Sequence, residues 1–384
     1  MNNTAPAAAP TQAATPVRPT GRLASIDLIK AIAVLMVVVY HISLCSYKVF
    51  DDPAIDTLAT FYLRCFLVVC VPLFFMANGY LLLPHKLDLR SHCIKILRLW
   101  LITLFWAAPT LAIELRLEGG SMSLLEFMTQ LNTFTGVEIH LWYMGALVCI
   151  YIFFPLIKLA YDRSRPIFLL FIAFTALTTF GSRLINQFFT LIDAIGGARY
   201  YGEPTDKWFS IFNPYNGIYG YTLVYFCLGG LVPDMLARLQ KKYPAMKSRN
   251  LLLTGCLLLG SLIHFAWFLF IYHKRNWYMC PIWYGYKTVS AVIMTVSAFL
   301  LCMNYRGQHR LPARLLQVVS GCSLGVYFLH MLVLLPLKPF VQAHMHWLCN
   351  LPGNVLLGLV VTAICVLVTL LIRRIPLLRQ LLKL

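Results

Sequence analysis

The chain has 384 residues, of which 60% are hydrophobic and only 12% are charged. A soluble globular domain is about half apolar and about a quarter charged, so this composition excludes one and indicates an integral membrane protein. The formal net charge of +18 would suit a nucleic-acid-binding protein, but membrane topology explains the distribution of basic residues better, and no nucleic-acid partner is expected.

The chain begins with a polar stretch and continues with repeated apolar runs. Residues 1–20 are rich in Ala, Pro and Thr, which predicts a disordered tail and leaves residues 21–384 as one membrane domain. Apolar runs of about twenty residues, the length that crosses a bilayer core of about 30 Å, then recur. We predict an all-α, polytopic helix bundle with about ten spans: 27–47, 58–83, 92–113, 140–161, 166–184, 216–236, 250–272, 282–304, 316–336 and 353–372.

The basic residues indicate how the bundle is oriented. Eighteen of the 32 Lys and Arg residues fall in the tail, the even-numbered loops and the C-terminal segment, against seven in the alternate loops. The positive-inside rule therefore predicts that both termini are cytoplasmic. Two long segments are predicted on the outer side. Segment 114–139 contains the amphipathic stretch "SMSLLEFMTQLN", which is expected to lie along the membrane interface. Segment 185–215 is predicted to form a structured loop.

The first span carries three ionisable residues, Asp27, Lys30 and His41. At about 100° and 1.5 Å per residue, Lys30 and His41 share one helix face about 16 Å apart, and Asp27 lies about 40° from His41 in projection. Such residues are functional candidates because a span tolerates them only where they face protein or water. In the alternative interpretation Asp27 and Lys30 pair at the inner interface and His41 is a packed histidine.

Two further spans contain residues that need an explanation. Arg64 lies in the second span, where a buried guanidinium requires a partner, and Pro72 breaks the same helix and frees backbone groups. His330 lies in the middle of the ninth span, three residues after Tyr327, and a histidine at that depth indicates a role or a partner. The remaining histidines do not form a pattern typical of a metal site, so no metal is expected.

Five motifs carry a resemblance to a known family. The opening "RLASIDLIKAIAVLMVVVYH" places Lys30 eleven positions before His41. The others are "VPLFFMANGYLLL", "KILRLW", "HLWYMGALVCIYIFFPLI" and "SLGVYFLHMLVLL". In this order, over residues 22–372, they resemble the membrane acyltransferase-3 family, integral O-acyltransferases that modify bacterial surface glycans. The most similar branch is the compact one that contains the enterobacterial common antigen O-acetyltransferase.

The chain departs from the family pattern in two places. Asn78 stands in the second-helix motif where serine is commoner. No fused periplasmic hydrolase domain follows the last predicted span, so the resemblance implies that the membrane domain itself completes the transfer.

The resemblance implies an enzyme of the bacterial inner membrane. Its expected reaction moves an acyl group, usually acetyl, from cytoplasmic acetyl-CoA to a hydroxyl of a cell-surface or lipid-linked glycan. A protonated sugar hydroxyl is a poor nucleophile, and a neutral imidazole can remove its proton. His41 is therefore the expected general base, or alternatively a covalent acyl carrier, with Asp27 and Lys30 on the same catalytic face.

The resemblance also implies a binding site for the phosphates of CoA at the inner face. Lys30, Lys95 and Arg98, with Arg64 deeper in the membrane, are the expected ligands. Ordinary positive-inside anchoring explains Lys95 or Arg98 equally well. The amide of Asn78 is expected to stabilise the developing oxyanion, with a packing role as the alternative.

The acceptor is expected to bind near the outer start of the fourth span. The stretch "EIHLWYM" combines a carboxylate with aromatic rings, which line membrane interfaces and also stack on sugars. The expected substrate-binding residues are Glu138, His140, Trp142, Tyr143, Tyr327 and His330.

Two other functions also fit a bundle with intramembrane charges. A transporter or flippase of a glycan or lipid-linked precursor is the main alternative, although such proteins more often show paired discontinuous helices in two halves. A multi-pass sensor or scaffold is the other, and it predicts that His41 and Arg64 tolerate replacement by alanine.

Overall fold

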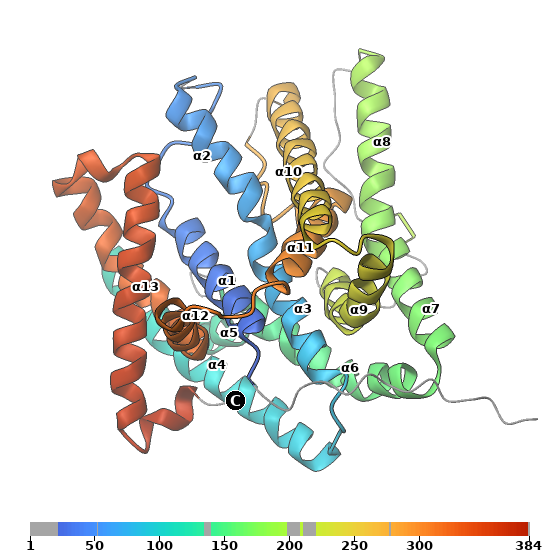
Figure 1. The fold of residues 1–384 in the computed structure, drawn as a ribbon. Coiled ribbons are helices and arrows are strands. Elements are labelled where there is room, and N and C mark those ends of the chain that lie inside the picture. Colours follow the sequence, from blue (N-terminus) through green and yellow to red (C-terminus); the bar gives the residue numbers. More distant parts are fainter. Residues whose placement is uncertain are drawn as a thin grey trace, which may run out of the picture.

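The computed structural model describes residues 22–51, 53–133, 140–197, 208–209, 220–275 and 278–382. Within these ranges the chain forms helices and no strands (Figure 1). The α-helices are α1 (Ala24–Ile42), α2 (Ile55–Phe66), α3 (Cys70–Leu82), α4 (Leu89–Glu118), α5 (Leu124–Thr133), α6 (Trp142–Arg163), α7 (Arg165–Ala176), α8 (Ser182–Ile195), α9 (Gly220–Lys242), α10 (Met246–Arg275), α11 (Val289–Cys302), α12 (Arg310–His344) and α13 (Leu351–Arg374). Among the described residues nine helical segments are long and apolar enough to cross a membrane, which confirms the predicted polytopic bundle.

Some predictions fall outside the described residues. The predicted disordered tail, residues 1–20, is among them, as are residues 198–207 and 210–215 of the predicted outer loop. The predicted amphipathic stretch is described and forms α5. Ser123 and Glu126 cap its start reciprocally, since the Glu126 carboxylate accepts from the Ser123 backbone N–H at 2.8 Å and the Glu126 N–H donates to Ser123 Oγ at 3.2 Å. The Ser123 N–H and hydroxyl both donate to the Glu126 carboxylate, and this lowers the pKa of Glu126 below its ordinary value.

Helix α1 lies in the middle of the bundle. It contacts α3, α12 and α13, and Figure 1 shows it between α13 on one side and α3 on the other. Val34 and Val38 are fully buried, and eleven of the nineteen residues of α1 are buried in all. Moving an aliphatic side chain from water into a protein interior contributes roughly 1.5–3 kcal/mol. Moving it from lipid into the protein contributes much less, because lipid is similarly apolar, and the close packing of side chains then stabilises the contact between helices. Close packing therefore directs most faces of α1 toward other helices.

The C-terminal end of α1, which the predicted topology places on the outer side, is fixed by α13. The helix ends before Ser43, which adopts a left-handed conformation with φ 48° and ψ 44°, so it is shorter than the predicted span 27–47. Asn354 Nδ2 donates to the Val39 carbonyl at 3.4 Å, and Asn354 Oδ1 accepts from the Leu44 N–H at 3.1 Å. These bonds satisfy groups that a helix end leaves open. The two helices lie close because residue 358 is glycine; a Cβ at Gly358 would stand 2.4 Å from Val39 Cγ2.

The second span is broken, but not at the expected residue. Helix α2 passes into a 3₁₀ turn, Leu67–Val69, before α3 begins. The change of geometry therefore precedes Pro72, which lies inside α3. Proline has no N–H to donate to the carbonyl four residues earlier, and this explains why the irregular turn is N-terminal to Pro72.

The fifth span is longer than the predicted 166–184. Helix α7 continues through a π-helical turn, Leu177–Gly181, into α8, and the whole segment runs to Ile195. The polar stretch "GSRLINQ" does not end the helix, because Ser182 and Arg183 are buried against protein. An amphipathic face packed against neighbouring helices can hold polar residues that a lipid-facing helix cannot.

The eighth span differs most from its prediction. The expected helix 282–304 is replaced by the short helix α11 and by residues 278–288, which form turns. At 1.5 Å per residue, the fourteen residues of α11 extend about 21 Å, less than the roughly 30 Å of a bilayer core. Helix α11 alone is therefore too short to cross a bilayer core, and residues 278–288 before it are not helical. Such a backbone is tolerated at membrane depth only where protein surrounds it, and most of this segment is buried.

The beginning and end of the described chain meet at one end of the bundle. Arg22 Nη2 donates to the Gln317 carbonyl at 2.7 Å, and Arg373 Nη2 donates to the Gly321 carbonyl at 2.6 Å, so both arginines bind the first turns of α12. Figure 1 shows the start of α1 and the C-terminal end on the same side of the bundle. The two ends thus share one face, and the assignment of that face to the cytoplasm stays a prediction.

Candidate active site

Three histidines meet at the outer end of α1. His41 lies in the last turn of α1, His140 just before α6, and His330 within α12. The ring centroids of His41 and His330 are 4.9 Å apart, those of His140 and His330 5.3 Å, and those of His41 and His140 6.4 Å. His330 and His140 are buried, whereas His41 is partly exposed. The helix packing thus brings together three residues that the sequence separates widely.

The hydrogen bonds of two of these rings decide which nitrogen carries a proton. His41 Nδ1 lies 2.8 Å from the Val37 carbonyl, and His330 Nδ1 lies 2.7 Å from the Tyr327 carbonyl. A carbonyl oxygen only accepts, so Nδ1 is the donor in both rings. In the neutral imidazole Nε2 then holds the lone pair, which makes Nε2 of His41 the nitrogen available to remove a proton.

His330 presents a second basic nitrogen. Its Nε2 is buried and has no hydrogen-bond partner among the described residues. A buried polar atom without a partner is destabilising by about 1–3 kcal/mol, so this atom points to a bound hydroxyl or another donor. Across the described ranges, no group of three His, Cys, Asp or Glu side chains is placed to hold a metal ion.

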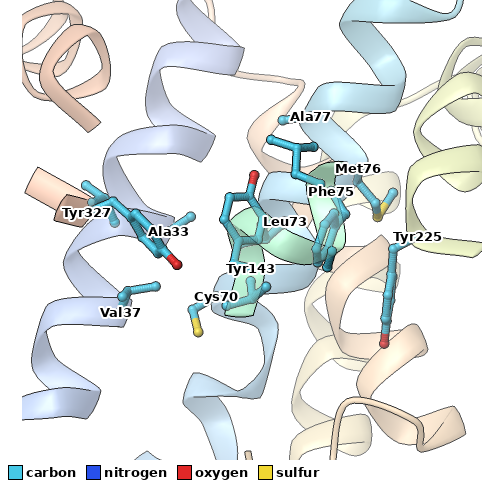
Figure 2. Close-up of a cluster of buried hydrophobic side chains, with 14 of the residues drawn as sticks. Ala33, Val37, Cys70, Leu73, Phe75, Met76, Ala77, Tyr143, Tyr225 and Tyr327 are labelled. Carbon is cyan, nitrogen blue, oxygen red and sulfur yellow. The ribbon is translucent and has the colours of Figure 1, made fainter. Parts of the chain in front are cut away.

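Two tyrosines lie on the inner side of the histidines. Figure 2 shows Tyr143 between α1, represented by Ala33 and Val37, and α3, with Tyr327 beside α1. Their ring centroids are 5.5 Å apart, and the Tyr327 hydroxyl donates to the His140 carbonyl at 2.5 Å. Phenolic groups therefore occupy the space between the histidines and the inner half of the bundle.

Asn78 is already engaged within the protein. Its Nδ2 donates to the Phe74 carbonyl at 3.0 Å and to the Tyr143 hydroxyl at 3.2 Å. An amide nitrogen has two hydrogens, so both donors are used. The neighbouring Gly79 has a packing role, because a Cβ there would stand 1.7 Å from the Phe226 carbonyl oxygen of α9. The available donor in this group is the Tyr143 hydroxyl, which has one proton of its own.

The inner end of α1 holds an ion pair that was not predicted. Asp27 accepts from Arg22 twice, from Nε at 2.7 Å and from Nη2 at 2.9 Å. Asp27 therefore does not pair with Lys30, as one interpretation of the sequence proposed. A bidentate arginine satisfies both carboxylate oxygens, and Asp27 is also about 21 Å from His41 along the helix. Its position indicates that it anchors the start of α1.

Lys30 and Lys95 form a positive region on the inner side. Neither nitrogen has a carboxylate within 4 Å in the described residues, and the two charges are close enough to repel each other. Lys95 Nζ lies 5.0 Å from the centroid of Tyr151. Arg98 is exposed beside them on α4. Two ammonium groups on one side of the bundle, neither of them in an ion pair with a described carboxylate, favour binding of an anion.

Comparison with known proteins identifies the family. The profile of a family described as an acyltransferase domain matches residues 23–374, which is most of the chain. The chain belongs to the acyltransferase-3 family. No curated protein and no solved structure among those compared matches it. The protein is thus a membrane acyltransferase, and the transporter and scaffold interpretations lose their support.

In this acyltransferase Arg64 does not lie with the inner lysines. Its Nη1 donates to Ser43 Oγ at 2.7 Å and its Nε donates to the Tyr278 hydroxyl at 3.0 Å. Ser43 is two residues beyond His41 on the outer side, so Arg64 is separated from Lys30 by most of the length of α1. This position agrees with the predicted topology, in which the second span, 58–83, begins at the outer side and Arg64 lies in its first third.

The predicted sugar-binding residues of the acyltransferase are distributed over two places. Tyr143 belongs to the tyrosine pair, while Trp142 is buried against Trp283 and Tyr286, with ring centroids 5.5 Å and 5.6 Å away. Trp142 thus supports the segment 278–288 and is not an exposed interfacial ring. Glu138 lies outside the described residues.

Several residues around the site of the acyltransferase were not predicted. Tyr40 packs against His41 with ring centroids 4.9 Å apart, and Lys338 of α12 is close enough for its charge to act on His41. Buried His264 of α10 faces the Pro281 carbonyl with Nε2, 3.0 Å away, and thereby holds the segment 278–288. A histidine in the middle of the seventh span was the one signal for this contact, since depth in a span marks a residue that needs a partner.

Proposed function

We propose that this protein transfers an acyl group, most simply acetyl, from cytoplasmic acyl-CoA to a hydroxyl of a cell-surface or lipid-linked glycan at the bacterial inner membrane. The observation that carries the proposal is the contact between His41 and His330 inside the bundle of an acyltransferase-3 protein. Two imidazoles with Nε2 as the lone-pair nitrogen are suited to bind and deprotonate a hydroxyl.

His41 acts as the general base of the transfer. Its Nε2 takes the proton of the acceptor hydroxyl while the hydroxyl oxygen bonds to the thioester carbonyl carbon. The carbon–sulfur bond then breaks, and the CoA thiolate leaves with the proton from the imidazolium of His41. General base catalysis of this kind contributes about 10²–10⁴-fold to a rate.

Neighbouring groups bind and orient the two reactants. His330 Nε2, buried and without a described partner, accepts a hydrogen bond from the acceptor. The Tyr143 hydroxyl, held by Asn78, donates to the carbonyl oxygen as negative charge develops. This assigns the oxyanion role to Tyr143, because both amide hydrogens of Asn78 are already used.

The donor enters from the opposite side. Lys30 and Lys95 bind the phosphates of CoA at the inner face, where these lysines have no described carboxylate partner. The pantetheine arm then extends toward His41 past Tyr143 and Tyr327. Lys30 and His41 are eleven residues apart, about 16 Å along the helix, a distance that an extended arm of this kind spans.

The test is acetyl transfer by the purified protein in lipid vesicles. Radiolabelled acetyl-CoA is supplied with a membrane glycolipid fraction, and label in the glycolipid is counted. We expect wild-type protein to transfer label and His41→Ala to lose at least about 100-fold in rate. His309→Ala is the matched control, because His309 is exposed at the start of α12, and it should retain the wild-type rate. Undiminished transfer by His41→Ala would refute the role of His41 as base.

A further inference from the structure

Arg64 lies in a polar aromatic box on the outer side of His41. Besides its hydrogen bonds to Ser43 and Tyr278, its guanidinium carbon lies 4.3 Å from the ring centroid of Tyr47 and 5.0 Å from that of Tyr40. Its Nη2 donates to no atom of the described residues. The residue is only 9% exposed, so the protein holds a cation here in one orientation, with one donor nitrogen unused.

The charge of Arg64 is not neutralised in the described part of the chain. The ion pairs found there are Arg22–Asp27, Lys48–Asp51, Lys158–Asp162 and Arg165–Asp234. A buried cation normally needs an anion, and tyrosine faces offset only part of its desolvation. Among the described residues no carboxylate plays this part, and a bound anion is suited to it.

A second cation lies close to the first. Lys338 of α12 is partly exposed and has no carboxylate within 4 Å among the described residues. It is near enough to Arg64 for the two charges to repel each other. Repulsion between two like charges is relieved when an anion binds near them, and the guanidinium offers a forked pair of donors to an oxyanion.

The position of this pair relates it to the acceptor and not to CoA. Tyr40 stands between Arg64 and His41, at 5.0 Å from the guanidinium carbon and 4.9 Å from the imidazole centroid. Arg64 is thus one side chain away from the proposed base, on the side opposite to Lys30. The inner lysines already provide cations for the CoA phosphates, so an anion on Arg64 belongs to the other reactant.

We propose that Arg64 and Lys338 bind an oxyanion of the acyl acceptor and so place its hydroxyl at His41. The assignment of this anion to the acceptor rests on the proposed acyl transfer. The oxyanion is either the phosphate that links a saccharide to its lipid or the carboxylate of an acidic sugar, and the two share the chemistry that the site recognises. A neutral glycan lacks the group that the two cations require.

Binding of three simple probes to the full-length protein in nanodiscs tests the proposal. The probes are decyl diphosphate, decyl glucuronide and decyl glucoside, which carry a phosphate, a carboxylate and no charge. We expect wild-type protein to bind at least one anionic probe about 10-fold or more tightly than decyl glucoside, since charge-assisted hydrogen bonds are the strong ones. The anionic probe that binds tighter identifies the source of the oxyanion.

Substitutions of Arg64 and Lys338 test whether these two cations bind the anionic probe. Arg64→Gln and Lys338→Gln should each weaken the preferred anionic probe by about 10–100-fold and leave the affinities for decyl glucoside and acetyl-CoA unchanged. Lys338→Gln keeps the test valid if Arg64→Gln does not fold, because Lys338 is partly exposed. Lys48→Gln is the control, since Lys48 is an exposed cation that pairs with Asp51 outside the cluster, and it should bind all three probes normally.

Two results would overturn the proposal. One is equal affinity of wild-type protein for charged and neutral probes. The other is a loss of acetyl-CoA binding in Lys338→Gln equal to the loss of the anionic probe, which would assign the cations to the donor. Because binding is measured without turnover, a protein that binds the anion through Arg64 but transfers no acetyl group would refute the proposed reaction and leave the anion site intact.

Discussion

The ring of His41 lies 4.9 Å from the ring of His330, although the first belongs to α1 and the second to α12. Both rings have Nδ1 bound to a backbone carbonyl of their own helix, so each presents Nε2 as its lone-pair nitrogen. The relationship defines the site as a pair of imidazoles with different surroundings: His41 is partly exposed, and His330 is completely buried.

Replacing His330 should impair the acceptor half of the reaction. His330→Ala removes a buried acceptor nitrogen that has no described protein partner, so we expect the KM for the acceptor to rise about 10-fold or more. The KM for acetyl-CoA should change less than twofold. Steady-state kinetics with each substrate varied in turn measures both values, and a rise confined to acetyl-CoA would contradict the assignment.

Asn354 should act on catalysis through the position of His41. Asn354→Ala removes the bonds to Val39 and Leu44 at the end of α1, and we expect a loss of about 1–3 kcal/mol in stability together with a lower kcat. Asn304→Ala is the control, because it removes a 2.7 Å hydrogen bond to Asn250 outside the site. If both variants lose stability but only Asn354→Ala loses kcat, α13 positions the base. Equal kcat values would argue that the contact is only structural.

Gly79 should be intolerant of any side chain. A Cβ at this position would stand 1.7 Å from the backbone oxygen of Phe226, and backbone atoms in packed helices cannot move aside. We expect Gly79→Ala to lower stability by about 3 kcal/mol or more in a thermal unfolding measurement in detergent. Gly255→Ala is the matched control, since nothing lies within 4 Å of its Cβ, and it should be neutral or slightly stabilising.

His264 should hold the irregular segment 278–288 in place. Its Nε2 lies 3.0 Å from the Pro281 carbonyl and its Nδ1 lies 3.3 Å from Thr288 Oγ1, so it connects two points of the segment to α10. In His264→Leu we expect faster hydrogen exchange in 278–288, with α13 unchanged, and a reduced rate of acyl transfer. If residues 278–288 of His264→Leu exchange hydrogen as slowly as in the wild type, other contacts hold the segment without His264. One such contact is the hydrogen bond from the Tyr225 hydroxyl to the Tyr286 carbonyl at 3.0 Å.

The helices whose bounds are set by the length of an uninterrupted apolar run could be predicted from the sequence. Helices α6 and α13 match spans 140–161 and 353–372 within two residues at each end, because uninterrupted apolar runs leave few alternatives. The eighth span was predicted at 282–304 and contains α11, but its start was placed seven residues too early, because residues 282–288 are apolar enough to resemble part of a span.

The residues of the site could be predicted from the sequence, but the contacts that they make could not. His41 and His330 were identified because an ionisable group at depth requires a partner, a rule that needs no structure. Arg64 was grouped with the inner lysines because of its charge, although the predicted second span begins at the outer side and so separates Arg64 from Lys30. Asp27 was placed on the catalytic face by helical periodicity, but its bond partner, Arg22, lies before the helix begins, where periodicity does not apply.

Transfer in vesicles with the two substrates on opposite sides tests the central claim most directly. The protein is inserted in one orientation, labelled acetyl-CoA is supplied only on the side of Lys30 and Lys95, and the acceptor is confined to the other side. The account predicts labelled acceptor with wild-type protein, and loss of at least about 100-fold in rate with His41→Ala. Transfer that requires both substrates on the same side, or that persists in His41→Ala, would contradict it.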